Sequence, residues 1–188
     1  MTNAFAVFET ALGWCALSWS EAGIVAGRLP QPGEAGVRAA MVKRFGEVEA
    51  APPPFAAEAV AGVQALMADG TTDLSHIQLD MAAIPPLHVQ LYAIARAIPP
   101  GETLTYGEVA ERLGDKNLAR EVGRGLGLNP FPPIVPCHRI LAASGKTGGF
   151  SAPGGVETKM KLLNLERART TSAPSLFDDL PLAVAPRR

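Results

Sequence analysis

The sequence predicts an α/β N-terminal domain with a small sheet, a mainly α-helical second domain with a helix-turn-helix, and a disordered tail. Alternating apolar and aromatic residues near the N-terminus indicate paired strands. The run Ile84-Pro85-Pro86 interrupts the chain, and two short helical segments joined by a glycine turn follow it. Beyond residue 168, Ser, Thr, Pro and Ala replace the periodic apolar residues. We therefore expect domains over 1–84 and 85–168 and a tail over 169–188.

The composition is that of a globular protein. Of 188 residues, 47% are hydrophobic and 19% are charged, and no apolar run reaches the roughly 18 residues of a membrane span. The first residues show no basic segment followed by an apolar one, so we expect no signal peptide and a cytoplasmic location. The 2 cysteines suit free thiols, and the 3 histidines are too widely spaced for a metal site. We expect a monomer with no metal, no cofactor and no membrane partner.

Charge is distributed unevenly along the chain. Residues 1–84 carry 4 basic and 9 acidic side chains, a balance of −5, whereas residues 85–168 carry 10 basic and 7 acidic, a balance of +3. The tail carries 3 basic and 2 acidic side chains, which completes the overall charge of −1. A basic second domain suits a polyanion such as nucleic acid, although solvated surface charge alone can produce the same asymmetry.

The pattern of the N-terminal segment predicts a sheet and two helices, and nothing in it indicates a reaction. Cys15 lies within the predicted hairpin and is best explained as a small buried thiol. His76 is expected to be an ordinary strand residue. The predicted elements are strands at Phe5–Glu9, Trp14–Trp19, Ile24–Leu29 and His76–Leu79, and helices at Glu34–Phe45 and Phe55–Ala68.

The second domain is predicted to begin with a helix over Leu87–Ile98, on which His88 is expected at the surface or at a cap. Thr105 and Glu108 then fit a capping box, because a Thr N-cap is followed three residues later by Glu. A short helix is therefore expected to run to Leu113.

A turn at Asp115-Lys116 and a helix over 117–127 complete a helix-turn-helix pattern. The N-terminal part of the second helix of such a motif faces DNA, and Arg120 and Arg124 lie there on one face. Many helical hairpins share this pattern, so the pattern alone does not establish DNA binding.

A proline-rich strap leads into the second cysteine. Residues 129–136 contain 4 prolines in 8 residues, which fix φ and remove amide donors, so we expect a stiff, extended strap. Cys137 at the end of this strap is therefore held by backbone with little freedom. The strap is followed by a strand at Ile140–Ala142, a turn at Ser144-Gly145-Lys146, a glycine-rich loop at Gly148–Gly155 and a helix at Glu157–Arg167.

Cys137 and His138 form a candidate nucleophile and base. A cysteine reacts as its thiolate, so its proton must be removed. Neighbouring side chains in an extended strand point to opposite faces, so His138 contacts the thiol only if the chain kinks or a water relays the proton. Glu166 on the last helix is a candidate acid to orient the imidazole. A Cys-His pair on its own also fits a cysteine hydrolase.

The segment Pro136-Cys137-His138-Arg139-Ile140 resembles the active-site signature of the O6-alkylguanine-DNA alkyltransferases, or methylated-DNA–protein-cysteine methyltransferases. Further similar segments follow in family order across about residues 85–167, whereas the N-terminal half matches only loosely. These segments are Ile98–Thr103, Thr105–Gly107, Ala119–Gly123, Asn129-Pro130, Ile134–Pro136, Gly148–Phe150 and Lys159–Glu166.

The resemblance implies a ribonuclease-H-like N-terminal fold, a winged-helix-like second domain, and single-turnover repair of O6-alkylguanine and O4-alkylthymine in double-stranded DNA. The protein would bind the minor groove, flip the nucleotide and take the alkyl group onto a cysteine. The implied catalytic residues are Cys137, His138, Glu166 and Tyr106. The implied DNA-binding residues are Thr105, Arg120, Arg124 and Gly123. The implied pocket and lid residues are Asn129, Pro136, Ile140, Phe150, Ser151 and Lys159.

Two departures from the family pattern concern the glycine-rich loop at Gly148–Gly155, which we call the lid. Phe150 stands where the family commonly has tyrosine, which removes a hydroxyl contact, and the loop from Phe150 to Lys159 is longer than usual. The zinc ligands of some members have no counterpart here. An alternative function is a non-catalytic alkyltransferase-like protein that binds lesions, but such relatives replace the cysteine. In the tail, Ser175-Leu176-Phe177 faintly resembles peptides that dock on bacterial sliding clamps, although the usual leading glutamine is absent.

Overall fold

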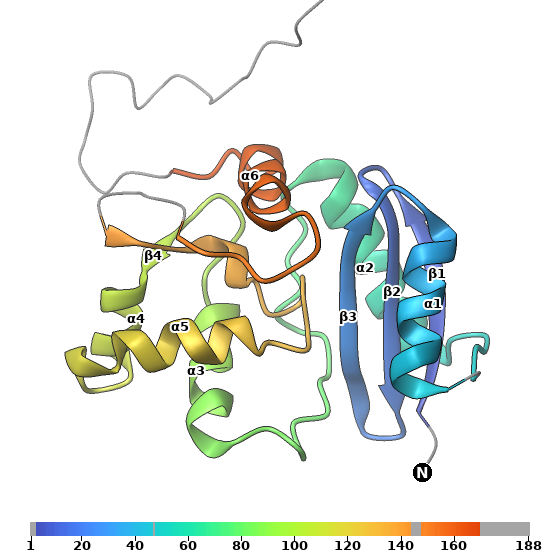
Figure 1. Cartoon of the computed structure of the whole chain (residues 1–188), viewed down its shortest axis with the longest axis horizontal. Coiled ribbons are helices and arrows are strands. Elements are labelled where there is room, and N and C mark those ends of the chain that lie inside the picture. The colour runs from blue at the N-terminus through green and yellow to red at the C-terminus, as the bar shows by residue number, and fades with distance from the viewer. Residues whose placement is uncertain (1–2, 47, 144–147, 170–188) are drawn as a thin grey trace, which may run out of the picture.

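A three-stranded antiparallel sheet with a helix on each face forms the N-terminal part of the chain (Figure 1). The computed structural model describes residues 3–46, 48–143 and 148–169. The strands pair in sequence order, and Phe8 lies opposite Cys15 in the first hairpin. These elements are β1 (Ala4–Thr10), β2 (Gly13–Ser20), β3 (Gly23–Gln31), α1 (Glu34–Phe45) and α2 (Pro54–Asp69). The first three predicted strands and the two predicted helices of this part are therefore confirmed.

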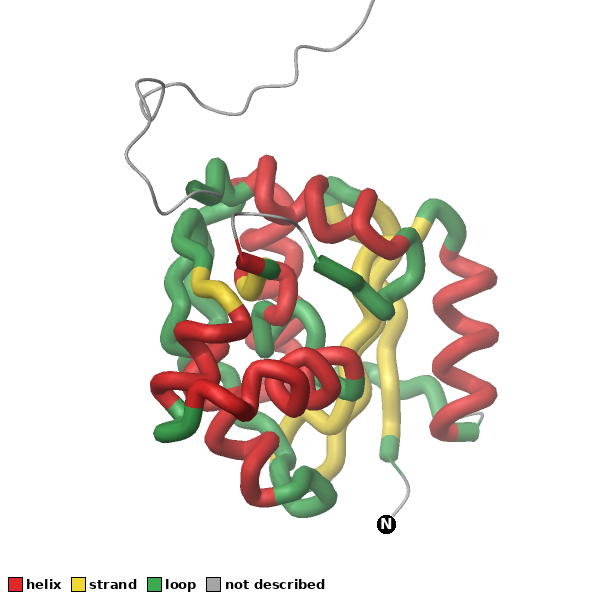
Figure 2. Tube along the Cα trace, turned by 60° about the vertical axis from the view of Figure 1, so that its left-hand side comes forward, coloured by secondary structure: helices red, strands yellow, loops and turns green. Residues whose placement is uncertain are grey.

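Alternation along the strands divides the sheet into an outer and an inner face. Phe5 and Ala16 pack with Val37 and Met41 of α1 on the outer face. Their neighbours, including the fully buried Cys15, point to the opposite face and pack with α2. Figure 2 shows α1 alone at the outer side of the strands, with the rest of the chain on the inner side. The inner face is thus the one that meets the C-terminal part.

The predicted strand over His76–Leu79 is wrong. This segment makes one isolated bridge, between Leu79 and Ile24 of β3, and His76 lies exposed in a turn, 3.4 Å from Glu58. The carbonyls of this segment are bonded to two different elements instead: the Ile77 carbonyl accepts from the guanidinium of Arg96 on the following helix, and the Gln78 carbonyl accepts from the Ile24 amide of β3. A side-chain donor thus takes the place of part of a strand ladder.

The C-terminal part is mainly helical. A minimal parallel pair, β4 with β5, joins the start of α4 to the segment after Cys137. The capping box at Thr105 and Glu108 is confirmed, because each side chain accepts from the other's backbone amide. A 3-10 turn at Lys116–Leu118 replaces the first turn of the predicted second helix. The elements are α3 (Pro86–Arg96), β4 (Leu104–Thr105), α4 (Tyr106–Arg112), α5 (Ala119–Gly127), β5 (Ile140–Leu141) and α6 (Gly155–Leu165).

The expectation that His88 lies at the surface or at a cap is wrong. His88 is only 7% exposed, and its Nε2 lies 3.2 Å from Oε1 of Glu121 on α5. The next turn of α3 adds Tyr92, whose hydroxyl donates to the carbonyl of Gly125. The buried side of α3 therefore faces α5 and carries polar anchors as well as Leu91 and Ala95.

The proline-rich strap, residues 129–136, packs into two hydrophobic cores. Ile134 packs into the core on the inner face of the sheet, while Phe131 and Val135 pack into the core formed by α3, α4 and α5. The backbone amide of Gly27 in β3 donates to the carbonyl of Pro130 at 2.8 Å. The sheet therefore binds the strap, the segment that leads to Cys137, through packing and a backbone hydrogen bond.

Gly27 is the position that permits this close approach. A Cβ atom there would lie 2.0 Å from the carbonyl oxygen of Pro132. Strand and strap therefore meet backbone to backbone, which no larger residue allows.

We predict that Gly27→Ala lowers the free energy of unfolding by about 1–3 kcal/mol, since the strap must shift to admit the methyl group. Gly36→Ala is the matched control, because Gly36 lies exposed within α1 with nothing within 4 Å of its Cβ position. That change should stabilise the protein by about 0.5–1 kcal/mol. Urea unfolding of both variants measures the difference, and equal stabilities would contradict the close contact.

Candidate functional site

Cys137, His138 and Arg139 form one 3-10 turn instead of the start of an extended strand. The turn is closed by the Arg139 amide donating to the Pro136 carbonyl at 2.9 Å. Successive side chains of such a turn point about 120° apart, since it has 3 residues per turn. The chain therefore does kink at Cys137 and His138, which the sequence analysis gave as one of two alternatives. The strand predicted at Ile140–Ala142 is shorter, Ile140–Leu141.

Behind the cysteine lies a buried charged cluster. His138 Nε2 lies 2.8 Å from Oε1 of Glu166, and Arg139 donates from Nε and Nη2 to the two oxygens of the same carboxylate at 2.9 and 2.8 Å. The side chains of His138 and Glu166 are each 1% exposed. The pairing of His138 with Glu166 that the sequence suggested is therefore present in the structure, but the carboxylate is shared with Arg139.

The electrostatics of the cluster keep Glu166 ionised and His138 neutral. Burial raises the pKa of Glu166, but the hydrogen bonds and charges of His138 and Arg139 outweigh it and lower that pKa to about 2. Burial lowers the pKa of His138, and the charges of Arg139 and Lys159 add to that, whereas Glu166 opposes it. A neutral imidazole beside a fixed carboxylate is ready to accept a proton.

The end of α6 that carries Glu166 rests against the N-terminal part of the chain. Gly70, which ends α2 with φ +67, has its Cβ position 2.2 Å from the carbonyl oxygen of Leu165. Only a glycine allows this backbone contact at that φ. The last turn before Glu166 is therefore positioned by α2.

Cys137 opens into a pocket of about 510 Å³. Burial raises the pKa of its thiol, while a hydrogen bond from Asn129 and the charge of Lys159 act in the opposite direction. Within the described chain, no direct hydrogen bond joins the thiol to the His138 ring. The pocket is lined by Tyr106, Gly123, Leu126, Gly127, Cys137, Gly149, Phe150 and Ser151.

Tyr106 of α4 and the lid residues Gly149, Phe150 and Ser151 all line this pocket. Burial raises the pKa of the Tyr106 hydroxyl, and the charge of Cys137 adds to the effect, so the phenol stays a hydrogen-bond donor. Phe150 lies 5.8 Å from the Lys159 ammonium, measured to the ring centroid. Ser151 donates to the carbonyl of Gly127 at 3.0 Å and so ties the lid to the end of α5.

Lys159 lies behind the lid. It is fully buried and donates from Nζ to the Ile140 carbonyl at 2.6 Å. Burial lowers its pKa to about 8, against the opposing effect of Cys137. It does not line the pocket, so its influence on the thiol is electrostatic.

The remaining strap residues shape the backbone around the thiol. Asn129 donates to the Val135 carbonyl at 2.9 Å and accepts from the Phe131 amide at 3.0 Å, which closes the strap on itself. Pro136 is buried. Ile140, which was expected in the pocket wall, is instead fully buried in the core of α3, α4 and α5.

The residues expected to contact DNA lie on α4 and α5. Arg120 is exposed in the first turn of α5, and Arg124 is exposed one turn later, 3.7 Å from Glu121. Thr105 caps α4, and Gly123 lines the pocket from α5. The exposed basic side chains and the mouth of the pocket therefore belong to the same helix.

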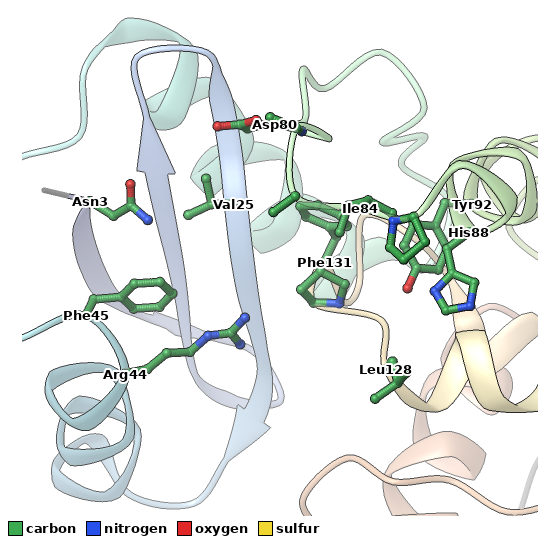
Figure 3. Close-up of a pocket in the computed structure, with 14 residues that line it drawn as sticks. Asn3, Val25, Arg44, Phe45, Asp80, Ile84, His88, Tyr92, Leu128 and Phe131 are labelled. Carbon is green, nitrogen blue, oxygen red and sulfur yellow. Dashed lines mark hydrogen bonds between the residues drawn. The ribbon is translucent and has the colours of Figure 1, made fainter. Parts of the chain in front are cut away.

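A second pocket of about 490 Å³ lies between the sheet and α3. Figure 3 shows Arg44 and Phe45 on one side and His88 and Tyr92 on the other, with Phe131 of the strap between them. Cys137 is not among the residues that line it, and no sequence motif points to it.

Several expectations concern parts of the chain without described structure. The turn at 144–146 and the clamp-like segment Ser175-Leu176-Phe177 fall outside the described residues. Among residues 3–46, 48–143 and 148–169, no group of three or more His, Cys, Asp or Glu side chains is arranged to hold a metal ion. No helix in the same ranges has the length and apolarity needed to cross a bilayer.

Sequence reasoning missed the part that Arg139 plays in this site. The residue was noted only as part of a motif, yet it makes more hydrogen bonds to Glu166 than His138 does. A basic residue directly after the candidate Cys-His pair was the available signal, since a charged side chain that becomes buried requires a partner.

Comparisons with known proteins identify relatives of this chain. Residues 86–168 match the family model described as "6-O-methylguanine DNA methyltransferase, DNA binding domain". The methylated-DNA--protein-cysteine methyltransferase of Mycobacterium leprae is 38% identical over 122 residues, 65% of this chain and 72% of that protein. The protein of the same name from Mycolicibacterium paratuberculosis is 44% identical over 89 residues, 47% of this chain and 53% of its own length. The chain thus spans about half the length of some relatives that it matches.

Solved structures extend the similarity to most of the chain. The crystal structure of Mycobacterium tuberculosis O6-methylguanine methyltransferase superimposes with a TM-score of 0.69 at 30% identity, covering 87% of this chain and 92% of that one. The structure of Mycobacterium tuberculosis OGT in complex with DNA gives a TM-score of 0.62 at 26% identity with the same coverage. The similarity includes the N-terminal sheet, which sequence alone matched only loosely.

We predict that Glu166 contributes stability that is lost in acid. Its pKa is about 2 in the folded protein against an ordinary value of 4.5, so the contribution is complete above about pH 4.5 and disappears as the pH falls toward 2. Glu166→Gln should therefore be less stable than the parent at neutral pH, and the difference should shrink between these pH values. Urea unfolding across this range measures the effect. Glu102→Gln, at an exposed position, is the control, and a pH dependence unchanged in Glu166→Gln would refute the assignment.

Proposed function

Because the chain belongs to the methylated-DNA–protein-cysteine methyltransferase family, we propose that it repairs DNA by transferring an alkyl group from O6 of guanine to Cys137. The observation that carries this proposal is the position of Cys137, which opens into a pocket and is followed in the same turn by His138, which contacts the buried Glu166. A thiol so placed has a base behind it and space for a substrate in front.

The reaction is a direct displacement. The thiol loses its proton to His138 through a water, and the sulfur attacks the alkyl carbon as the bond to the guanine oxygen breaks. Tyr106, at the pocket wall, donates a hydrogen bond or proton to the guanine ring as it leaves. The product thioether has no route back to a thiolate, so each chain acts once.

Access to the lesion requires the nucleotide to leave the duplex, at the expense of a few kcal/mol. We propose that α4 and α5 form the helix-turn-helix of a winged-helix-like domain, that α5 binds the minor groove, and that Arg120 fills the space of the flipped base. Arg124, Thr105 and Gly123 then lie at the same interface. The similarity to a structure solved in complex with DNA supports DNA as the partner. O4-alkylthymine is proposed as a second substrate on the family resemblance alone.

The alternative of a non-catalytic lesion-binding protein is less well supported, because the thiol, His138 and Glu166 are all present in one buried arrangement. A cysteine hydrolase would need a free thiol after each cycle, which an S-alkylated cysteine does not provide.

We predict that incubation with DNA containing O6-methylguanine adds the mass of one methyl substituent to the tryptic peptide that contains Cys137. Cys137→Ala should leave the DNA methylated, because no nucleophile remains in the pocket. Mass spectrometry of the protein together with nucleoside analysis of the DNA measures both sides. An unmodified Cys137 peptide after complete demethylation of the DNA would rule out the transfer.

We predict that Arg120→Ala lowers the rate of methyl transfer from duplex DNA by roughly tenfold or more, since the few kcal/mol spent on flipping is then less well compensated. The loss should be smaller on a single-stranded substrate, which needs no flipping. Arg112→Ala is the control, because Arg112 is an exposed arginine in the last turn of α4. Equal losses for the two variants on duplex DNA would argue against a specific role for Arg120.

A further inference from the structure

Arg139 is a buried cation that the proposed roles leave unused. The residue is 5% exposed, and its guanidinium donates to both oxygens of Glu166 and, from Nη1, to the carbonyl of Ile98 at 2.7 Å. A planar guanidinium fork matches a carboxylate in a way that an ammonium cannot. Arg139 therefore fixes the orientation of Glu166 and ties it to the segment that follows α3.

A fixed carboxylate determines where His138 carries its proton. An ionised carboxylate only accepts hydrogen bonds, so the 2.8 Å contact between Glu166 and Nε2 requires a proton on Nε2. A neutral imidazole has one ring proton. Nδ1 is therefore the unprotonated nitrogen and the only basic atom of the ring.

We propose that Arg139 is a positioning residue for alkyl transfer. Its hydrogen bonds to Glu166 fix the carboxylate, which keeps the ring proton of His138 on Nε2 and leaves Nδ1 to receive the thiol proton. This inference rests on the proposed function. The proton that leaves sulfur moves to Nδ1 through a water, the S–C bond forms as the C–O bond breaks, and the electron pair of that bond stays on the guanine. The guanine ring gains one proton from Tyr106 while the imidazolium holds the proton that left sulfur, so the net proton count does not change.

The charge of Arg139 also affects the strength of the base. Two cations, Arg139 in the same turn and Lys159 on α6, lower the pKa of His138, whereas Glu166 raises it. Asp73, from the segment after α2, is a further acidic group whose charge interacts with Arg139. Removing the Arg139 charge should raise the pKa of His138, so a larger fraction of the imidazole is protonated and inactive near neutral pH.

Two substitutions separate the geometry of Arg139 from its charge. Arg139→Lys keeps the charge and loses the fork, so the single-turnover rate should fall on the order of ten- to a hundredfold at every pH, part of what a general base contributes. Arg139→Met also loses the charge, so the acid limb of the pH–rate profile should move to higher pH, with about a tenfold loss per pH unit below the limb. Arg167→Met is the matched control, an exposed arginine next to Glu166 with the same change of charge.

The expected result is an acid limb of the pH–rate profile at the parental pH in Arg139→Lys and at a higher pH in Arg139→Met. Arg167→Met should keep the parental pH–rate profile. An unmoved limb in folded Arg139→Met, while the parent transfers methyl groups, would overturn this inference and leave the proposed function standing. A parent protein that transfers no methyl group would overturn the proposed function and the inference together.

The parent protein provides a test that does not depend on whether the variants fold. With ¹⁵N-labelled histidine, the ring nitrogens of the 3 histidines are few enough to assign by single substitutions. His138 should show a protonated Nε2 and an unprotonated Nδ1 near neutral pH. The opposite tautomer would overturn the inference.

Discussion

The contact between β3 and the proline strap is the constraint on which the rest of the site depends. Gly27 meets Pro130 and Pro132 backbone to backbone, and Ile134 of the strap is buried in the core of the sheet. Because the strap ends at Cys137, the N-terminal part of the chain sets where the thiol lies. A second backbone contact, between Gly70 and Leu165, positions the residue before Glu166. The acidic N-terminal half, which shows no reactive motif, thus positions both Cys137 and Glu166 of the candidate catalytic set.

The buried cluster behind the thiol balances its own charge. A lone carboxylate beside a buried histidine would favour the imidazolium and so leave less of the imidazole as free base, whereas a lone arginine there would be costly to bury. Glu166, shared by His138 and Arg139, satisfies both. The lowered pKa of His138 and the raised pKa of Cys137 then suit a thiol that stays protonated until a substrate is in place.

Local features were predictable from sequence and contacts between distant segments were not. The limits of α1 and the capping box of α4 depend on nearby residues, and both were predicted accurately. The strap was predicted to be non-helical because proline restricts its own backbone, but it is turned and not extended as predicted, with the Val135 amide donating to the Phe131 carbonyl. His88 was placed at the surface because its partner, Glu121, lies 33 residues away on α5. The strand over His76–Leu79 was wrong for the same reason, since the Ile77 carbonyl accepts from Arg96, 19 residues away on α3.

The candidate site shows the same division. Cys137, His138 and Glu166 could be named from residue type and from the family resemblance, but Arg139 gained a role only when the fold brought it to Glu166 across 27 residues. Ile140 illustrates the limit of transfer by resemblance, because its position in the motif does not reveal that the side chain faces the core.

The central claim is that Cys137 is consumed by accepting an alkyl group, and its most direct test is stoichiometry. With an excess of DNA containing O6-methylguanine, the account predicts that repair stops when about one methyl group has been removed per chain, because the thioether is not turned over. Sustained removal of many methyl groups per chain would contradict it.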